Sequence, residues 1–134
     1  MNKLILFLFG GLSYFIIEIL WRGYSHWSMF LLGGLCFLLI GLLNERLMQN
    51  TPIIPQALIG AFIITALEFI AGCILNIHLE LDVWDYYDMP FNILGQICLP
   101  YSILWVILSL VCIVFDDYLR YMFLGGEKPQ YKII

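Results

Sequence analysis

Charged residues are scarce in this chain, and basic residues are the scarcest of them. Of its 134 residues 12% are charged, and only six are Lys or Arg against ten Asp or Glu. A soluble domain is about 25% charged, so a water-exposed domain of this size would lack the polar surface to cover itself. The net charge of -4 also excludes a basic surface for nucleic acid, so we expect no nucleic-acid partner.

Motifs that bind metals or nucleotides are missing as well. The four cysteines are separate residues in apolar runs, with no Cys-x-x-Cys or Cys/His spacing, so we expect no metal site and interpret them as buried apolar side chains. No Walker-type glycine loop is present, so the chain cannot hydrolyse ATP by itself. His26 and His78 are isolated at the ends of apolar runs. We therefore expect no cofactor and no catalytic residue.

Apolar residues, in contrast, make up 63% of the chain. They fall into four runs, each close to the ~20 residues that a membrane-spanning helix needs. Connectors that contain charged and aromatic residues separate the runs. The sequence therefore predicts an all-α, polytopic membrane protein, a four-helix transmembrane bundle whose spans cover about 4–20, 28–43, 53–77 and 93–115.

One transmembrane domain, residues 1–124, occupies nearly the whole chain. After the fourth run, residues 116–124 alternate aromatic and charged side chains, a pattern typical of a helix that lies at the headgroup level. Gly125 and Gly126 then end that helix. We expect residues 125–134 to form a short cytoplasmic tail.

The distribution of Lys and Arg predicts the orientation. With four crossings, both termini and the middle connector lie on one side of the membrane. That side carries all the basic residues except Arg22. By the positive-inside rule, both termini are cytoplasmic in a multi-pass protein of the cell membrane, with membrane lipids around it. The third connector then faces outward and carries four acids without Lys or Arg.

Two glutamates, Glu18 and Glu68, fall within the apolar runs. An ionisable group in a span costs roughly 2.5–3.5 kcal/mol on insertion scales, so its presence needs a reason in packing or in function. Both glutamates lie on helical stripes of small or polar residues, which mark contacts between helices. We expect both to face the bundle interior, with Arg22 as the ion-pair partner of Glu18 one turn away.

The start of the fourth run adds amide groups at a similar depth. It carries Asn92 and Gln96 ahead of Pro100. Because proline has no N–H, the carbonyl of Gln96 loses its helical partner and needs another donor within the membrane. We therefore predict that these amides and the two glutamates form a polar cluster in the outer half of the bundle.

The third connector and the residues after it resemble a known family. Clustered acids in this connector match no EF-hand spacing, so we do not interpret it as a calcium site. A family signature resembles two runs of this region, Trp84-Asp85-Tyr86 and then Pro90-Phe91-Asn92-Ile93-Leu94-Gly95-Gln96-Ile97-Cys98-Leu99. It is the signature of the putative ABC-transporter type IV permease family. These are the CmpB-like small bacterial membrane proteins, which are related to an uncharacterised vertebrate transmembrane family. Further similarities to that family are Glu18 with Arg22-Gly23, Glu68 with Gly72, Trp105, and Glu127-Lys128-Pro129-x-Tyr131. The chain departs from longer members after Gly23, where Tyr24-Ser25-His26-Trp27 stands in place of a Pro-rich run.

The resemblance implies a transporter or permease-like subunit of a bacterial membrane, working with a partner membrane subunit or ATPase subunit. The polar cluster would be its outward-facing site. A single bundle of this size leaves little room for a two-state pathway, so we also expect a homo-oligomer. The candidate ligand-binding or ion-pathway residues are Glu18, Arg22, Glu68, Trp84, Asp85, Tyr86, Asn92 and Gln96.

Three alternatives stay open on the sequence alone. The chain is a structural or adaptor protein whose polar cluster only fixes helix packing, or it is a small pore-forming, holin-like protein. It is otherwise an enzyme acting on lipids or envelope precursors, with Glu68 or Asp85 as the base. The enzyme hypothesis is the weakest of these, because no nucleophile–base pair is present in the sequence.

Overall fold

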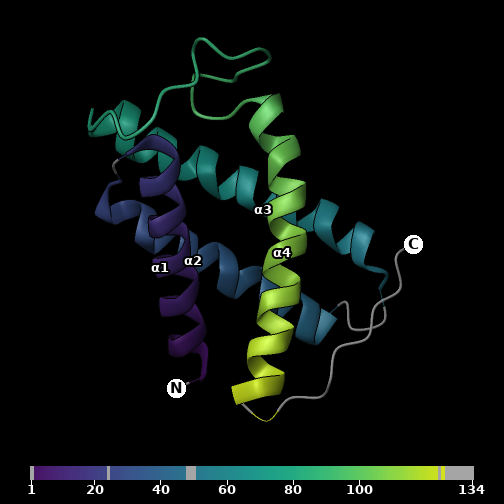
Figure 1. The fold of residues 1–134 in the computed structure, drawn as a ribbon. Coiled ribbons are helices and arrows are strands. Elements are labelled where there is room, and N and C mark those ends of the chain that lie inside the picture. Colours follow the sequence, from purple (N-terminus) through teal and green to yellow (C-terminus); the bar gives the residue numbers. More distant parts are fainter. Residues whose placement is uncertain (1, 24, 48–50, 124, 126–134) are drawn as a thin grey trace.

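The computed structural model describes residues 2–23, 25–47, 51–123 and 125 (Figure 1). All regular secondary structure within these residues is helical, and no strand is formed. Two π-helical segments, η1 and η2, directly continue the second and third helices. The elements are α1 (Asn2–Arg22), α2 (Trp27–Leu42), η1 (Leu43–Leu47), α3 (Ile53–Gly72), η2 (Cys73–His78) and α4 (Leu99–Phe123).

The helices are apolar enough to lie in a bilayer. Within the described residues, four helical segments have the length and composition to cross a membrane, with mean hydropathies between 1.9 and 2.4. Many of their large apolar side chains point outward, among them Leu20 and Phe62. Outward-facing apolar side chains are stable only against lipid. The predicted all-α transmembrane bundle is confirmed.

Helices α1 and α4 run along the long axis of the view, and α2 and α3 cross it obliquely (Figure 1). Helix α1 packs mainly against α2, and α4 packs mainly against α3. The start of α1 and the end of α4 lie at the same end of the bundle, opposite the third connector, residues 79–98 (Figure 1). This arrangement is the one that an even number of crossings produces.

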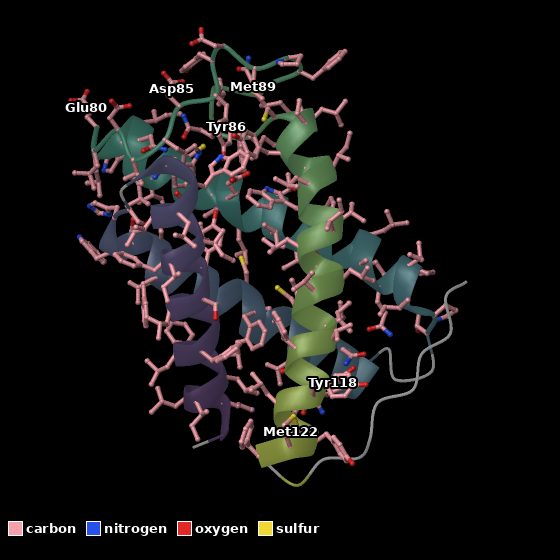
Figure 2. All side chains as sticks on the ribbon, in the orientation of Figure 1. Glu80, Asp85, Tyr86, Met89, Tyr118 and Met122 are labelled. Carbon is pink, nitrogen blue, oxygen red and sulfur yellow. The ribbon has the colours of Figure 1, made fainter. Side chains whose placement is uncertain are left out.

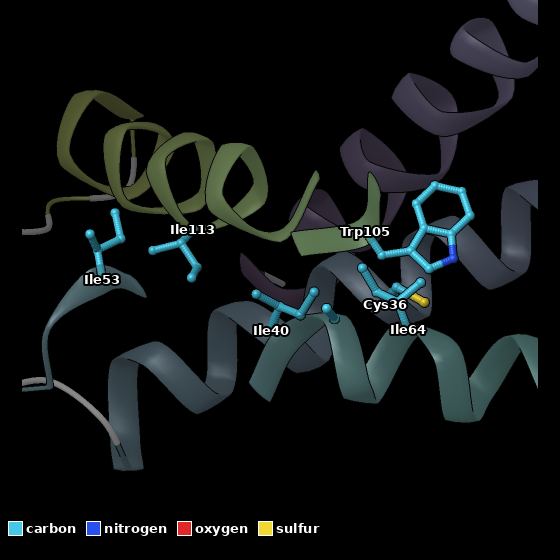
Figure 3. Close-up of a cluster of buried hydrophobic side chains, with 7 residues drawn as sticks. Cys36, Ile40, Ile53, Ile64, Trp105 and Ile113 are labelled. Carbon is cyan, nitrogen blue, oxygen red and sulfur yellow. The ribbon is translucent and has the colours of Figure 1, made fainter. Parts of the chain in front are cut away.

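The core joins α2, α3 and α4. Its buried side chains interdigitate where these helices meet (Figure 3). On the opposite face of α2, glycines allow α1 to approach closely. A Cβ atom on Gly34 would lie 2.7 Å from the backbone carbonyl oxygen of Phe7, so a larger residue would push the two helices apart. The labelled core residues are Cys36, Ile40, Ile53, Ile64, Trp105 and Ile113.

We expect Gly34→Ala to lower the free energy of unfolding by about 1–3 kcal/mol, because the added methyl group overpacks the α1–α2 contact. Thermal unfolding in detergent measures this loss. Leu35→Ala is the control, since Leu35 is the exposed neighbour and its truncation creates no clash. If both variants lose the same stability, close backbone approach is not what holds α1 against α2.

The fourth helix differs from its predicted range, which began near residue 93. Helix α4 begins at Leu99, because Leu94 and Gly95 before it have φ values of 55° and 71°, which a right-handed helix excludes. Pro100 therefore lies in the first turn, where a missing N–H removes no helical bond.

The end of the fourth helix differs from the prediction as well. Helix α4 continues to Phe123 without a break, so residues 116–123 are part of it and not a separate interfacial helix. The reason is that this last part of the helix stays in contact with the bundle through Asp116, which is fully buried. Apart from Gly125, the predicted tail, which includes Glu127 to Tyr131 of the family resemblance, lies outside the described residues.

Candidate functional site

Glu68 lies in α3 on the face that points into the bundle, and only 3% of it is exposed. Nε1 of Trp105 in α4 donates a hydrogen bond to its Oε1 at 3.2 Å, and the hydroxyl of Tyr86 donates to its Oε2 at 3.0 Å. In both hydrogen bonds the carboxyl group is the acceptor. Among the described residues no Lys, Arg or His lies within ion-pair distance of Glu68.

Tyr86 covers the connector side of Glu68. It points from the connector into the bundle (Figure 2), where its ring stacks on Tyr101 with 5.0 Å between the centroids. Burial raises the pKa of the Tyr86 phenol well above its ordinary value, and the neighbouring Glu68 raises it further. The phenol therefore stays protonated and acts as a donor to Glu68.

Glu18 and Arg22 form the predicted ion pair near the C-terminal end of α1. Nε of Arg22 lies 2.7 Å from Oε2 of Glu18, one helical turn away. Nη1 of Arg22 also donates to the carbonyl of Val83 in the connector at 3.0 Å. The pair therefore ties α1 to the connector.

Gln96 is held in a second network in which the connector meets η2. Nε1 of Trp84 donates to the backbone carbonyl of Gln96 at 2.9 Å, so this carbonyl has a donor outside any helix. Nδ2 of Asn76 donates to the Gln96 side-chain oxygen at 2.8 Å, and Oδ1 of Asn76 accepts from the backbone N–H of Val83 at 2.7 Å. Asn76 was not among the predicted site residues, although it bridges the connector and the bundle.

Asp85 and Asn92 lie apart from Glu68. Asp85 is exposed at the outer edge of the connector, where its carboxylate accepts from the backbone N–H of Tyr87 (Figure 2). Asn92 bonds backbone groups within the connector, including the carbonyl of Met89. Both residues shape the connector, and the structure brings neither to the buried carboxyl group.

A cavity of about 80 Å³ extends from Glu68 in the direction away from the connector. All of α1 to α4 contribute to its walls, which are mostly apolar. The residues with a polar or sulfur atom in these walls are Ser13, Tyr14, Cys36, Glu68 and Cys112. No sequence pattern indicates this cavity, because it depends on how far α1 and α4 are apart.

A second buried polar cluster lies at the opposite end of the bundle. Asp116 of α4 is fully buried, and its Oδ2 accepts from Nη2 of Arg120 at 2.7 Å. Arg120 also contacts Asp117, and it lies 3.3 Å from Glu45 in η1. Asn44 of η1 donates to Asp117, so the cluster links α4 to the end of α2. The spacing of four residues between Asp116 and Arg120 is the available sequence signal, but the prediction of an interfacial helix over 116–124 does not use it.

Neither cluster has the composition of a metal centre. Across the part of the chain that the structure describes, no group of three His, Cys, Asp or Glu side chains is arranged to hold a metal ion. What the site offers chemically is one buried carboxyl group, held by two donors, at the wall of a small apolar space.

These features define a class, the multi-pass helical membrane proteins with a buried carboxyl group at an intramembrane cavity. A family model described as Putative ABC-transporter type IV matches residues 5–125. The chain belongs to this family, as its resemblance implied. No curated protein and no solved structure matches the chain.

Proposed function

We propose that the chain is the membrane-embedded subunit of a transport system and that Glu68 contacts the transported ion or solute. One observation carries this proposal. Glu68 is buried at the wall of a cavity, and no cationic partner lies beside it among the described residues. Ionisable groups inside a membrane commonly mark pathways for ions or substrates. Membership of the transporter family supports the same role.

Access to Glu68 from outside passes the connector. The Tyr86 hydroxyl occupies one carboxyl oxygen, so the outward-facing site predicted from the sequence opens when Tyr86 moves away. In this proposal the Tyr86–Glu68 hydrogen bond is the outer closure. The connector faces out, and the end of the bundle that carries Asp116 is cytoplasmic, where an ATPase subunit would dock. A second copy of the chain would supply the other half of a pathway.

Glu68→Gln tests the role of the carboxyl group. Glutamine keeps an acceptor for Trp105 and offers an N–H to the Tyr86 oxygen, so the fold is retained while the charge is lost. In proteoliposomes we expect wild-type protein to pass protons, alkali cations or a lipophilic cation dye faster than protein-free vesicles. Glu68→Gln should reduce that flux by at least about tenfold, the effect of losing one charge-assisted contact.

Glu80→Gln is the matched control, because Glu80 is an exposed connector residue that undergoes the same chemical change. It should retain wild-type flux. Full flux in Glu68→Gln would remove this residue from the pathway. A wild-type chain without flux of any of these probes would contradict transport by the chain alone.

A structural role is the second candidate, and the network around Asn76 favours it. Asn76, Gln96, Trp84 and Arg22 all bond partners in the fold, as expected for groups that fix packing. If Glu68 likewise only fixes helix packing, Glu68→Gln lowers the melting temperature and no small molecule shifts that temperature.

A further inference from the structure

We propose that the cavity between α1 and α4 binds the ammonium end of a singly charged alkyl amine, which enters from the bilayer with Glu68 as its counter-charge. This inference deepens the proposed function, because it rests on the same carboxyl group and names the class of ligand. Three features support it, namely the position of the entrance, the chemistry of the walls and the size of the space.

In this proposal the entrance is the lipid-facing side of the cavity, where the lining residues Ile17, Val111 and Phe115 are exposed. Helices α1 and α4 each pack mainly on another helix, and they face each other across two aromatic pairs. The centroids of Phe9 and Phe115 are 6.4 Å apart, and those of Tyr14 and Trp105 are also 6.4 Å apart. Phe9, Phe115 and Tyr14 all line the cavity. A ligand between these pairs therefore comes from the hydrocarbon and does not have to cross the connector.

The exposed parts of the lining are apolar. Ile17 of α1 and Val111 of α4 line the cavity and also face outward, into the region that acyl chains occupy. A fully charged, water-soluble solute would have to lose its hydration before it reached this entrance. A molecule with an alkyl chain reaches the same place by partitioning into the membrane first.

The inner wall selects for a cationic group. Glu68 is the one Asp or Glu of the lining. Each of its oxygens accepts one hydrogen bond from a described residue, so each keeps a free lone pair for an N–H donor. A charge-assisted bond from an ammonium group would be stronger than a neutral one. An anionic headgroup would instead be repelled by the same carboxylate.

An alkyl amine fits better than an inorganic cation. Calcium takes six to eight oxygen ligands and magnesium about six, whereas the polar oxygens of these walls come from Ser13, Tyr14 and Glu68. No metal-binding group of side chains is present in the described residues either. An ammonium group needs only donor contacts, and its attached methylenes satisfy the apolar walls.

The volume limits how much of the ligand is enclosed. A dry cavity of about 150 Å³ binds benzene, and this cavity is smaller, at about 80 Å³. It therefore has room for the ammonium group and the first few methylenes. The rest of the chain would lie between α1 and α4 and continue into the bilayer.

The test compares octylamine with octanol, which has the same chain without the charge. Purified full-length protein in nanodiscs is titrated with each compound, and thermal unfolding reports binding. We expect octylamine to bind wild-type protein with an apparent Kd at least about tenfold lower than octanol, the effect of one charge-assisted hydrogen bond. In Glu68→Gln the two compounds should become equal, and Glu80→Gln should keep the wild-type preference.

Ser13→Leu places the site independently of the carboxyl group. Ser13 lines the cavity, so leucine fills part of the space and should abolish the preference for octylamine while Glu68 remains. This variant also tests the inference if Glu68→Gln does not fold. Equal affinity of wild-type protein for the two compounds would overturn the inference, as would an unchanged preference in Ser13→Leu.

The binding experiment and the flux experiment test the two proposals independently. Octylamine preference that depends on Glu68 in a protein without flux would leave the ligand inference standing and remove the transport proposal. Flux that depends on Glu68 without octylamine preference would leave the transport proposal standing and remove the ligand inference.

Discussion

Asn76→Ala should lower the free energy of unfolding by about 2–6 kcal/mol. The substitution removes the donor to the Gln96 side chain and the acceptor for the backbone N–H of Val83, both short bonds. Leaving a buried polar group without a partner costs about 1–3 kcal/mol for each group. Because Val83 and Gln96 are buried, both losses count. Thermal unfolding in detergent or nanodiscs measures the change.

The same substitution should also loosen the connector over Glu68. Hydrogen exchange of the Val83 and Trp84 amides, which both face Oδ1 of Asn76, should become faster in the variant. Asn92→Ala is the matched control, because Asn92 bonds backbone groups inside the connector and does not reach α3 or η2. An equal effect of the two substitutions would show that the bridge to η2 does not hold the connector in place.

Gly41→Ala should destabilise the opposite end of the bundle by about 3 kcal/mol or more. A Cβ atom on Gly41 would lie 2.6 to 2.8 Å from the carboxyl atoms of Asp116. The carboxyl group cannot retreat without weakening its bonds to Arg120. Overpacking costs about 1–3 kcal/mol, and disturbing a buried charge pair adds to this loss.

A double-mutant cycle isolates the cause. In an Asp116→Ala background the added methyl group meets no carboxyl group, and alanine in a helix is better than glycine by roughly 0.5–1 kcal/mol. Gly41→Ala should therefore become neutral or slightly stabilising there, which is a coupling of at least about 3 kcal/mol. If Gly41→Ala costs the same in both backgrounds, the loss comes from elsewhere on α2.

The two ends of the bundle divide the polar groups by role. Around Asn76 and around Arg120 the partners are supplied by the fold itself, so these groups position α4 and the connector. Glu68 differs from them because it borders on the cavity. It has hydrogen-bond donors beside it but no cationic side chain among the described residues. The functional proposals therefore concern Glu68 and not the whole set of buried polar residues.

Sequence alone determined the membrane-spanning helices and the burial of Glu68 inside the bundle. Hydrophobic run length and helical spacing are local properties, so they need no knowledge of neighbouring helices. The Glu18–Arg22 pair was predictable for the same reason, since residues four apart on a helix are always neighbours. The donor to the Gln96 carbonyl was not predictable, because the expectation from Pro100 assumed a helix through Gln96, whereas α4 begins only at Leu99 and the donor is Trp84 of the connector.

Only the tertiary structure decided which groups meet. That Tyr86 and Trp105 donate to Glu68, that Asn76 holds Gln96, and that Asp116 is buried against Gly41 all depend on contacts between segments far apart in the chain. The left-handed residues ahead of α4, which delay its start to Leu99, belong to a connector whose shape is set by those contacts. Lateral packing between helices is set by the sum of many weak contacts, and no single stretch of sequence contains that sum.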